Sequence, residues 1–267
     1  PGTALLALTL AAYALAMTVG RGRFGLVNMA LLVAAALGAG LFVVAETRAA
    51  SPLIRLARFR DPLLSASLAM SVLVSTVLMA TLVIGPFYLA GGLGLDTALV
   101  GIVMSAGPVM AALTGVPAGR IVDRLGTPRT TVGGLAGMAV GCAALGMAPA
   151  TLGIAGYVVP VAIVAAGYAL FQAANNTAVM ADVAPDQRGV VSGMLNLSRS
   201  LGLITGASVM GTVFALASHA ADVTMSHPEA VARGMRVTFA VAAALAVVAL
   251  VIALGGLAPA RPGARRP

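Results

Sequence analysis

The sequence contains few charged residues, one cysteine, no lysine and no tryptophan. Charged residues make up 9% of the 267, whereas hydrophobic residues make up 60%. Because soluble domains are about one quarter charged, this composition excludes an ordinary soluble globule. The one cysteine, Cys142, excludes a disulfide within the chain and a CxxC metal or redox centre.

The apolar stretches lack the groups that catalysis and nucleotide binding require. They hold no cluster of His, Asp or Glu, and Cys142 has no base beside it, so neither a metal site nor a hydrolytic nucleophile is expected. Without lysine the chain also has no Gly-rich phosphate-binding loop ending in Lys-Ser or Lys-Thr. We therefore expect no enzyme, no catalytic residue, no cofactor and no metal.

The net charge of +8 does not indicate a nucleic-acid partner. A nucleic-acid surface needs basic residues gathered on one water-facing side, with aromatic residues between them. Here the sixteen arginines are scattered between apolar runs. We therefore expect no nucleic acid, and we expect the lipid bilayer as the surroundings of the chain.

Long uncharged runs account for most of the sequence. A helix that crosses a membrane needs about 20 apolar residues, and the charged residues leave eight windows of this kind. We predict an all-α membrane protein with about eight transmembrane helices. Pro149, Thr151 and Gly153 supply the turn that divides the longest uncharged run into two spans. The windows are 3–19, 26–45, 63–90, 97–119, 130–148, 152–181, 189–217 and 237–257.

The arginines predict the orientation of these spans. Eight spans place both ends of the chain on one side, and if that side is cytoplasmic the inner loops hold eleven arginines and the outer loops four. Cytoplasmic loops carry the excess of basic residues, so we predict a multi-pass protein of the cell membrane with both ends cytoplasmic. His219 and His227 then lie in an outer loop, and we assign them no role. The outer arginines are Arg21, Arg23, Arg233 and Arg236.

The most specific motif runs from Gly119 to Arg129, which we expect to form a short loop after the fourth span. It holds one acid, several arginines and two glycines that permit close backbone approach. Asp123 can offset the arginines or lie at the N-terminus of a neighbouring helix, where an anion is favoured. A basic cytoplasmic turn with no further role is the alternative.

The pattern Gly-x-x-x-Asp-Arg-x-Gly in this motif resembles the loop signature of the major facilitator superfamily. Family copies usually continue with two basic residues, whereas here Thr127 and Pro128 precede the last arginine. The resemblance implies a conformational latch on the cytoplasmic side, formed by Asp123 and Arg124. The implied gating motif is Gly119, Asp123, Arg124, Gly126 and Arg129.

A second stretch, residues 184–193, reads Ala-Pro-Asp-Gln-Arg-Gly-Val-Val-Ser-Gly and is followed by Asn196, Arg199, Gly202 and Gly206. Together these residues resemble a helix junction in the C-terminal half of fourteen-helix drug:proton antiporters of the EmrB/QacA type. The resemblance implies two extra transmembrane helices in residues 1–45, a cytoplasmic linker in 46–62, a six-helix C-terminal half in 63–258 and a basic cytoplasmic tail in 259–267. It also implies that an N-terminal six-helix half, which carries the usual proton-coupling acids, is a missing partner.

Arg199 lies ten residues into a predicted span. An arginine at the centre of a membrane helix costs about 2.5–3.5 kcal/mol, so something must compensate for it. No acid lies inside a predicted span, so the partner would be a backbone carbonyl, a water-filled cavity, Asn196, Gln172 or a group of the absent half. Extension of the side chain to the cytoplasmic headgroups is the alternative.

Other polar residues recur within the spans at helical spacing. Ser192, Asn196 and Arg199 share one face of a span, and a polar face in lipid must look inward. Amides can line a cavity or hydrogen-bond neighbouring helices, and serines can bond to their own helix carbonyls, so both interpretations stay open. The expected substrate-cavity residues are Gln172, Asn175, Asn176, Asn196, Arg199, Ser71 and Ser75.

Glycines and prolines within the spans predict packing and breaks. Glycines at four-residue spacing favour close helix crossings, whereas Gly-Pro pairs favour kinks inside a bundle. The spaced glycines are Gly133, Gly137 and Gly141, and Gly202 with Gly206, and the pairs are Gly85-Pro86 and Gly107-Pro108.

The resemblance implies a secondary active transporter that works by alternating access around a site at the membrane midplane. We expect proton-coupled efflux of apolar or cationic drug-like small molecules. Because the predicted spans hold no acid, cation recognition and proton coupling would both depend on the missing half. The alternative is a non-transporting membrane scaffold or a remnant half-transporter.

Overall fold

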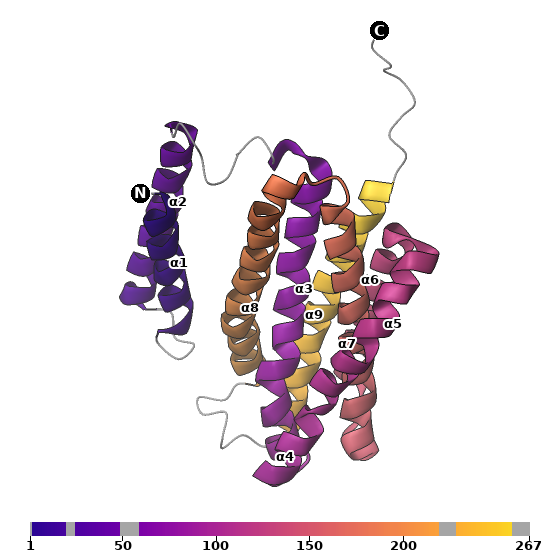
Figure 1. Ribbon diagram of the computed structural model, residues 1–267. Coiled ribbons are helices and arrows are strands. Elements are labelled where there is room, and N and C mark those ends of the chain that lie inside the picture. The colour runs from indigo at the N-terminus through magenta and orange to yellow at the C-terminus, as the bar shows by residue number, and fades with distance from the viewer. Residues whose placement is uncertain (1, 20–24, 49–58, 219–227, 258–267) are drawn as a thin grey trace.

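The computed structural model describes residues 2–19, 25–48, 59–218 and 228–257, which form a bundle of long helices and contain no strand (Figure 1). Short turns of other helix types connect some of them, namely the π-helix η2 (Tyr88–Gly92), η3 (Ala150–Leu152) and η4 (Pro185–Gln187). The α-helices are α1 (Gly2–Thr18), α2 (Leu26–Arg48), α3 (Pro62–Phe87), α4 (Thr97–Met104), α5 (Ala106–Leu125), α6 (Thr127–Met147), α7 (Gly153–Met180), α8 (Arg188–Ser218) and α9 (Pro228–Leu257).

The predicted all-α membrane fold is confirmed. Seven helical segments of the described residues are long and apolar enough to cross a membrane, and α1 is a shorter apolar helix of 17 residues. The turn between the fifth and sixth predicted spans is also present, because Gly153 begins α7 with φ +56°, a conformation that glycine adopts without strain. The start of the last span differs from the prediction: α9 begins at Pro228, so Arg233 and Arg236 lie in its first turns and not in a loop.

The fourth span is broken at Ser105, between α4 and α5. Pro108 lacks the N–H that would bind the carbonyl of Met104, the last residue of α4, so the predicted break at Gly107-Pro108 appears one turn before the proline. Pro86 has a different effect, because α3 continues through it and changes to the π-helix η2 after Phe87. Gly85-Pro86 therefore changes the helix type and does not interrupt the span.

Glycines bring the helices of the bundle into backbone contact. Gly202 of α8 lies against α3, where the Thr76 hydroxyl donates a 3.0 Å hydrogen bond to the Gly202 carbonyl. Gly134 of α6 faces Gly167 of α7, and a Cβ at either position would come within 2.7 Å of the other's carbonyl oxygen. The predicted contact is wrong for Gly133, which has no described atom near its Cβ position.

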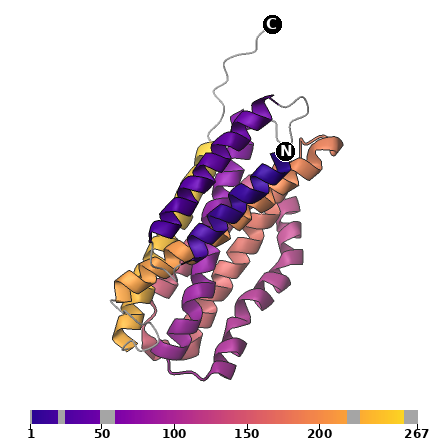
Figure 2. The ribbon, with the colours of Figure 1, turned by 90° about the vertical axis from the view of Figure 1, so that its left-hand side faces the viewer.

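The α1–α2 hairpin lies beside α8, on the opposite side of the bundle from α5 (Figures 1 and 2). The hydroxyls of Tyr13 on α1 and Thr205 on α8 share a hydrogen bond of 2.5 Å. Within the hairpin, the Asn28 amide donates to the carbonyls of Ala16 and Val19, which completes the end of α1. Asn28 therefore joins α2 to the end of α1, and α1 attaches the hairpin to α8 of the bundle.

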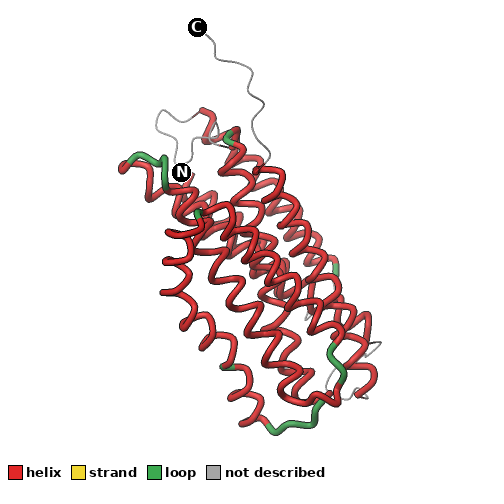
Figure 3. The backbone as a smooth tube through the Cα atoms, turned by 90° about the vertical axis from the view of Figure 1, so that its right-hand side faces the viewer, coloured by secondary structure: helices red, strands yellow, loops and turns green. Residues whose placement is uncertain are grey.

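The span made of α4 and α5 is the least covered part of the bundle (Figure 3). Its buried residues are Val103, Ala118 and Val122, and its inner side packs on α7. The opposite side is exposed and apolar, with Leu113 and Val116 each about two-thirds accessible (67% and 68%). Within the described part of the chain, nothing packs against this side of α5.

Candidate functional site

The motif from Gly119 to Arg129 forms the end of one helix and the start of the next. Helix α5 continues through Asp123 to Leu125, Gly126 alone makes the turn with φ +80°, and α6 begins at Thr127. The expected loop is therefore wrong for residues 119–125 and 127–129. A single residue suffices for the turn because glycine adopts this left-handed conformation without strain.

The charged residues of the motif are exposed at the end of α5. The side chains of Asp123 and Arg124 make no hydrogen bond or ion pair with any residue that the structure describes, and Gly119 has no described atom within 4 Å of its Cβ position, apart from its own helix backbone. Asp123 lies in the last turn of α5, where the helix dipole disfavours an acid. The carboxylate of Asp123 therefore does not serve to stabilise α5.

Two hydrogen-bonded pairs of polar side chains lie on α7 and α8, one pair on each helix. Arg199 Nη1 donates to Asn196 Oδ1 at 3.3 Å, so one of the partners predicted for Arg199 is present. Gln172 Nε2 donates to the Tyr168 hydroxyl at 3.0 Å. We call Gln172, Tyr168, Asn196 and Arg199 the polar patch.

The polar patch lies near the middle of both helices. Tyr168 is twelve residues before the end of α7, which is about 18 Å at 1.5 Å per residue. Arg199 is eleven residues after the start of α8, or about 16 Å. Arg199 is half-buried and Asn196 is exposed, so the patch opens away from the interior of the described bundle.

Of the remaining predicted cavity residues, Asn175 lines a cavity of about 430 Å³ between α3, α6, α7 and α9, and the others lie at helix contacts or on the surface. Asn175 Nδ2 donates to Ser71 Oγ at 3.1 Å, and this pair is buried between α7 and α3. Ser75 is buried against Gly202 of α8. Asn176 is exposed on α7, one turn from Gln172. Their role in a cavity stays a prediction.

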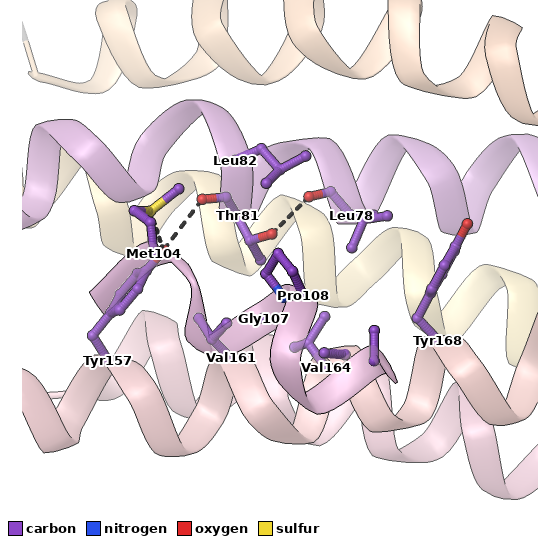
Figure 4. A pocket seen from close by; sticks show the side chains of 12 residues that line it. Leu78, Thr81, Leu82, Met104, Gly107, Pro108, Tyr157, Val161, Val164 and Tyr168 are labelled. Carbon is purple, nitrogen blue, oxygen red and sulfur yellow. Dashed lines mark hydrogen bonds between the residues drawn. The ribbon is translucent and has the colours of Figure 1, made fainter. Parts of the chain in front are cut away.

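A slot of about 170 Å³ lies between α3, the break between α4 and α5, and α7 (Figure 4). At one end, the Tyr157 hydroxyl donates to the Thr81 carbonyl and to Met104 Sδ, at 3.3 Å each. Tyr168 of the polar patch lies at the other end. The lining is Leu78, Thr81, Leu82, Met104, Gly107, Pro108, Ala111, Tyr157, Val161, Val164, Ala165 and Tyr168.

The sequence interpretation did not single out Tyr157 and Tyr168. A signal for them exists, because tyrosine is rare in this chain, with four residues, and two of them follow a helical repeat on α7. Positions 157, 161, 164 and 168 share one face of the helix, and all four line the slot. By sequence alone, this stretch is predicted only as part of an apolar span.

The fold and the site define a multi-pass membrane protein that holds an arginine, hydrogen-bonded to Asn196, about halfway along α8, and an apolar slot between α3, α5 and α7. The family model described as Major Facilitator Superfamily matches residues 3–207 and 68–267. The chain therefore belongs to the major facilitator superfamily.

Several transporters are similar in sequence. A chain from Mycobacterium tuberculosis named "Drug efflux pump JefA" is 32% identical over 193 residues, which are 70% of this chain and 36% of that protein. "Uncharacterized transporter YebQ" of Escherichia coli is 30% identical over 60% of this chain and 35% of its own length. "Riboflavin transporter RibZ" of Clostridioides difficile is 24% identical over 65% of this chain and 38% of its own. This chain thus spans about a third of the length of these relatives.

Solved transporter structures share the fold. The nucleoside transporter NupG superposes with a TM-score of 0.63 at 18% identity, over 94% of this chain and 64% of that chain. A bacterial homologue of the iron transporter ferroportin, in an outward-facing state, superposes with a TM-score of 0.57 at 19% identity, over 95% of this chain and 60% of its own. At this identity the likeness shows the fold alone.

Proposed function

We propose that this chain is the C-terminal portion of a fourteen-helix efflux transporter of the EmrB/QacA type. It exports apolar or cationic drug-like small molecules in exchange for protons, by alternating access, across the cell membrane. In this proposal both ends of the chain are cytoplasmic, residues 1–45 are the two extra helices, 46–62 the linker, 63–258 the six-helix half and 259–267 the basic tail. The observation that carries the proposal is the polar patch at mid-membrane depth.

The uncovered side of α5 supports a missing partner half. An apolar helix face of this size can pack against another set of helices, and the matched segments cover only 35% and 36% of the length of two of the relatives. Transporter folds place their substrate site between two such repeats. The N-terminal six-helix half would then cover α5 and complete the cavity at the polar patch.

The exposed end of α5 supports a latch at Asp123. Its carboxylate has no partner among the described residues and opposes the dipole of its own helix. A positively charged or N-terminal helix end of the other half would favour this carboxylate in one state of the transport cycle. The gating motif would thus bias the equilibrium between two arrangements of the halves.

The test is an efflux assay on the protein as its gene encodes it, in bacteria that lack their own major efflux pumps. Cells expressing the protein are expected to accumulate less ethidium than vector controls, and a protonophore is expected to remove the difference. Dye accumulation equal to that of the vector control, with the protein present in the membrane, would overturn the transport proposal in favour of the scaffold alternative.

A further inference from the structure

Helices α3, α6, α7 and α9 surround a cavity of about 430 Å³ at one end of the bundle, where α3 and α6 begin and α7 and α9 end. Small residues leave this space open, namely Ala66 of α3, Ala178 of α7, and Gly255 and Gly256 of α9. Small-molecule sites in proteins measure roughly 300–1,000 Å³. The cavity is therefore large enough for a ligand, whereas the slot, at about 170 Å³, is not.

The cavity is open to the surface at the helix ends. Pro128 of α6 and Gly256 of α9 line it and are exposed. Its inner wall is buried and includes Ser67 and Met70 of α3 and Asn175 of α7. A molecule can therefore enter between the helix ends and reach the buried wall.

Ser67 places an unused hydroxyl in this wall. The residue is 1% exposed, and its hydroxyl makes no hydrogen bond within the described part of the chain. Among the described residues, Tyr88 alone has a side-chain oxygen that is both unbonded and fully enclosed. The unbonded oxygen of Ser67 is therefore accessible from the cavity that the residue lines. A hydroxyl without a partner in an apolar interior costs free energy, so this one calls for a ligand or water.

Asn175 supplies an acceptor from α7. Its Nδ2 donates to Ser71 Oγ at 3.1 Å, which fixes the amide. Its Oδ1 has no donor among the described residues and, like the Ser67 oxygen, is not fully enclosed. Ser67 lies four residues before Ser71, about 6 Å along α3. One ligand group that carries both a donor and an acceptor can therefore reach Ser67 and Asn175 together.

The lining of the cavity carries no charge. It includes no Asp, Glu, Lys, Arg or His. The helix dipoles oppose one another, because the positive ends of α3 and α6 meet the negative ends of α7 and α9. An ionised group that entered would lose its hydration without gaining a counter-charge. The cavity therefore selects uncharged ligands.

We propose that this cavity binds an uncharged small molecule that has a compact apolar body and a carboxamide or comparable group. The ligand carbonyl accepts a hydrogen bond from Ser67 Oγ, and the ligand N–H donates to Asn175 Oδ1. The apolar body packs against Leu63, Met70 and Ile252. None of the lining residues belongs to the polar patch, so the site is additional to the substrate site of the proposed function and does not depend on it.

Equilibrium binding tests the proposal without requiring transport. The protein as its gene encodes it is purified in detergent, and saturable binding is measured at neutral pH for radiolabelled adamantane-1-carboxamide, adamantane-1-carboxylate and 1-adamantylmethylamine. These probes share one apolar body and differ in a neutral, negative or positive group. We expect the carboxamide to bind at least tenfold more tightly than either charged probe, because a charged group is desolvated without a partner.

Ser67→Ala removes the proposed donor and is expected to weaken carboxamide binding about fivefold. The unfolding temperature of the ligand-free protein should not fall, because the hydroxyl has no described partner to lose. Ser200→Ala, on an exposed part of α8, is the matched control and should change neither quantity. A serine with only a structural role would instead lower the unfolding temperature and leave binding unchanged.

A second pair of variants tests the space for the apolar body. Ala178→Leu places a larger side chain in the cavity, so it is expected to weaken carboxamide binding about tenfold. Ala244→Leu, exposed on α9 outside the cavity, should leave binding unchanged. Ser67→Ala keeps the test informative if Ala178→Leu does not fold.

Three results would each overturn the inference. A charged probe could bind as tightly as the carboxamide, or Ser67→Ala could bind the carboxamide with unaltered affinity. Carboxamide uptake could also fail to saturate, which would mean that the probe only partitions into detergent and that water fills the cavity. Absence of ethidium efflux with the expected affinities intact would count against the proposed function alone.

Discussion

Helices α8 and α5 use glycine in opposite ways. On α8, Gly202 and Gly206 lie against α3, and a Cβ at Gly206 would come 2.8 Å from the Thr76 carbonyl oxygen. On α5, Gly115 and Gly119 have no described atom within 4 Å of their Cβ positions. The comparison shows that the glycines of α8 allow close packing against α3, whereas the glycines of α5 lie on a side that no described helix covers.

The two helices also differ in where their charge lies. Arg199 of α8 is held at mid-membrane depth by Asn196, beside the closed contact with α3. Asp123 of α5 stands at the helix end without a partner among the described residues. We interpret the α3–α8 contact as the part of the bundle that holds the polar patch in place. We interpret the exposed side of α5 as the surface that packs against the other half of the transporter.

The largest expected effect is on stability, at the closed contact. Gly202→Val places a branched side chain against the backbone of Val72, so the free energy of unfolding should fall by about 1–3 kcal/mol. Gly133→Val, on the open side of α6, should change it by less than about 0.5 kcal/mol. Thermal unfolding of both variants in detergent measures the difference. Equal losses would mean that the α3–α8 contact is not what closes the bundle.

The sequence predicted the spans well because each is bounded by charges or by a turn with a physical cause. Helix α7 begins at Gly153, within the predicted turn. The fourth span breaks at Ser105, two residues before the predicted break at Gly107-Pro108. The glycine contact on α6 was misplaced by one residue: a strict four-residue repeat drifts around a helix of 3.6 residues per turn. Gly134, and not Gly133, therefore faces α7.

The candidate site was predicted only in part. The Arg199–Asn196 pair follows from helical spacing, because residues three apart are neighbours on a helix. The slot does not follow, because it requires knowing that α7 faces the break between α4 and α5. The helical form of residues 119–125 was also missed, since charged residues near a glycine are compatible with both a loop and a helix end.

The second expected effect is on transport, at the open side. Asp123→Asn should lower the ethidium efflux rate about tenfold, as expected for the loss of one charged interaction in the latch. Stability should be unchanged, because the carboxylate is exposed and unpartnered among the described residues. Asp186→Asn, an exposed acid of η4, is the control and should transport normally. Unchanged efflux by Asp123→Asn would remove the latch from the account.

The smallest effect is expected at the buried amide between the two regions. Ser71→Ala leaves Asn175 Nδ2 without its 3.1 Å acceptor, so the free energy of unfolding should fall by about 1 kcal/mol. Asn176→Ala, on the exposed side of α7, should have no measurable effect on stability. If the two variants unfold alike, the Ser71–Asn175 pair does not hold α3 and α7 together.

The most direct test asks whether the polar patch faces water or lipid. Cys142 is buried and is the only cysteine in the chain, so Cys142→Ala gives a background in which single cysteines can be placed. In the protein as its gene encodes it, Asn196→Cys should react quickly with a water-soluble maleimide, and ethidium should slow the reaction. Val140→Cys, exposed on α6, should react slowly because lipid covers it. Labelling of Asn196→Cys as slow as that of Val140→Cys, with no protection by ethidium, would contradict a substrate cavity at the polar patch.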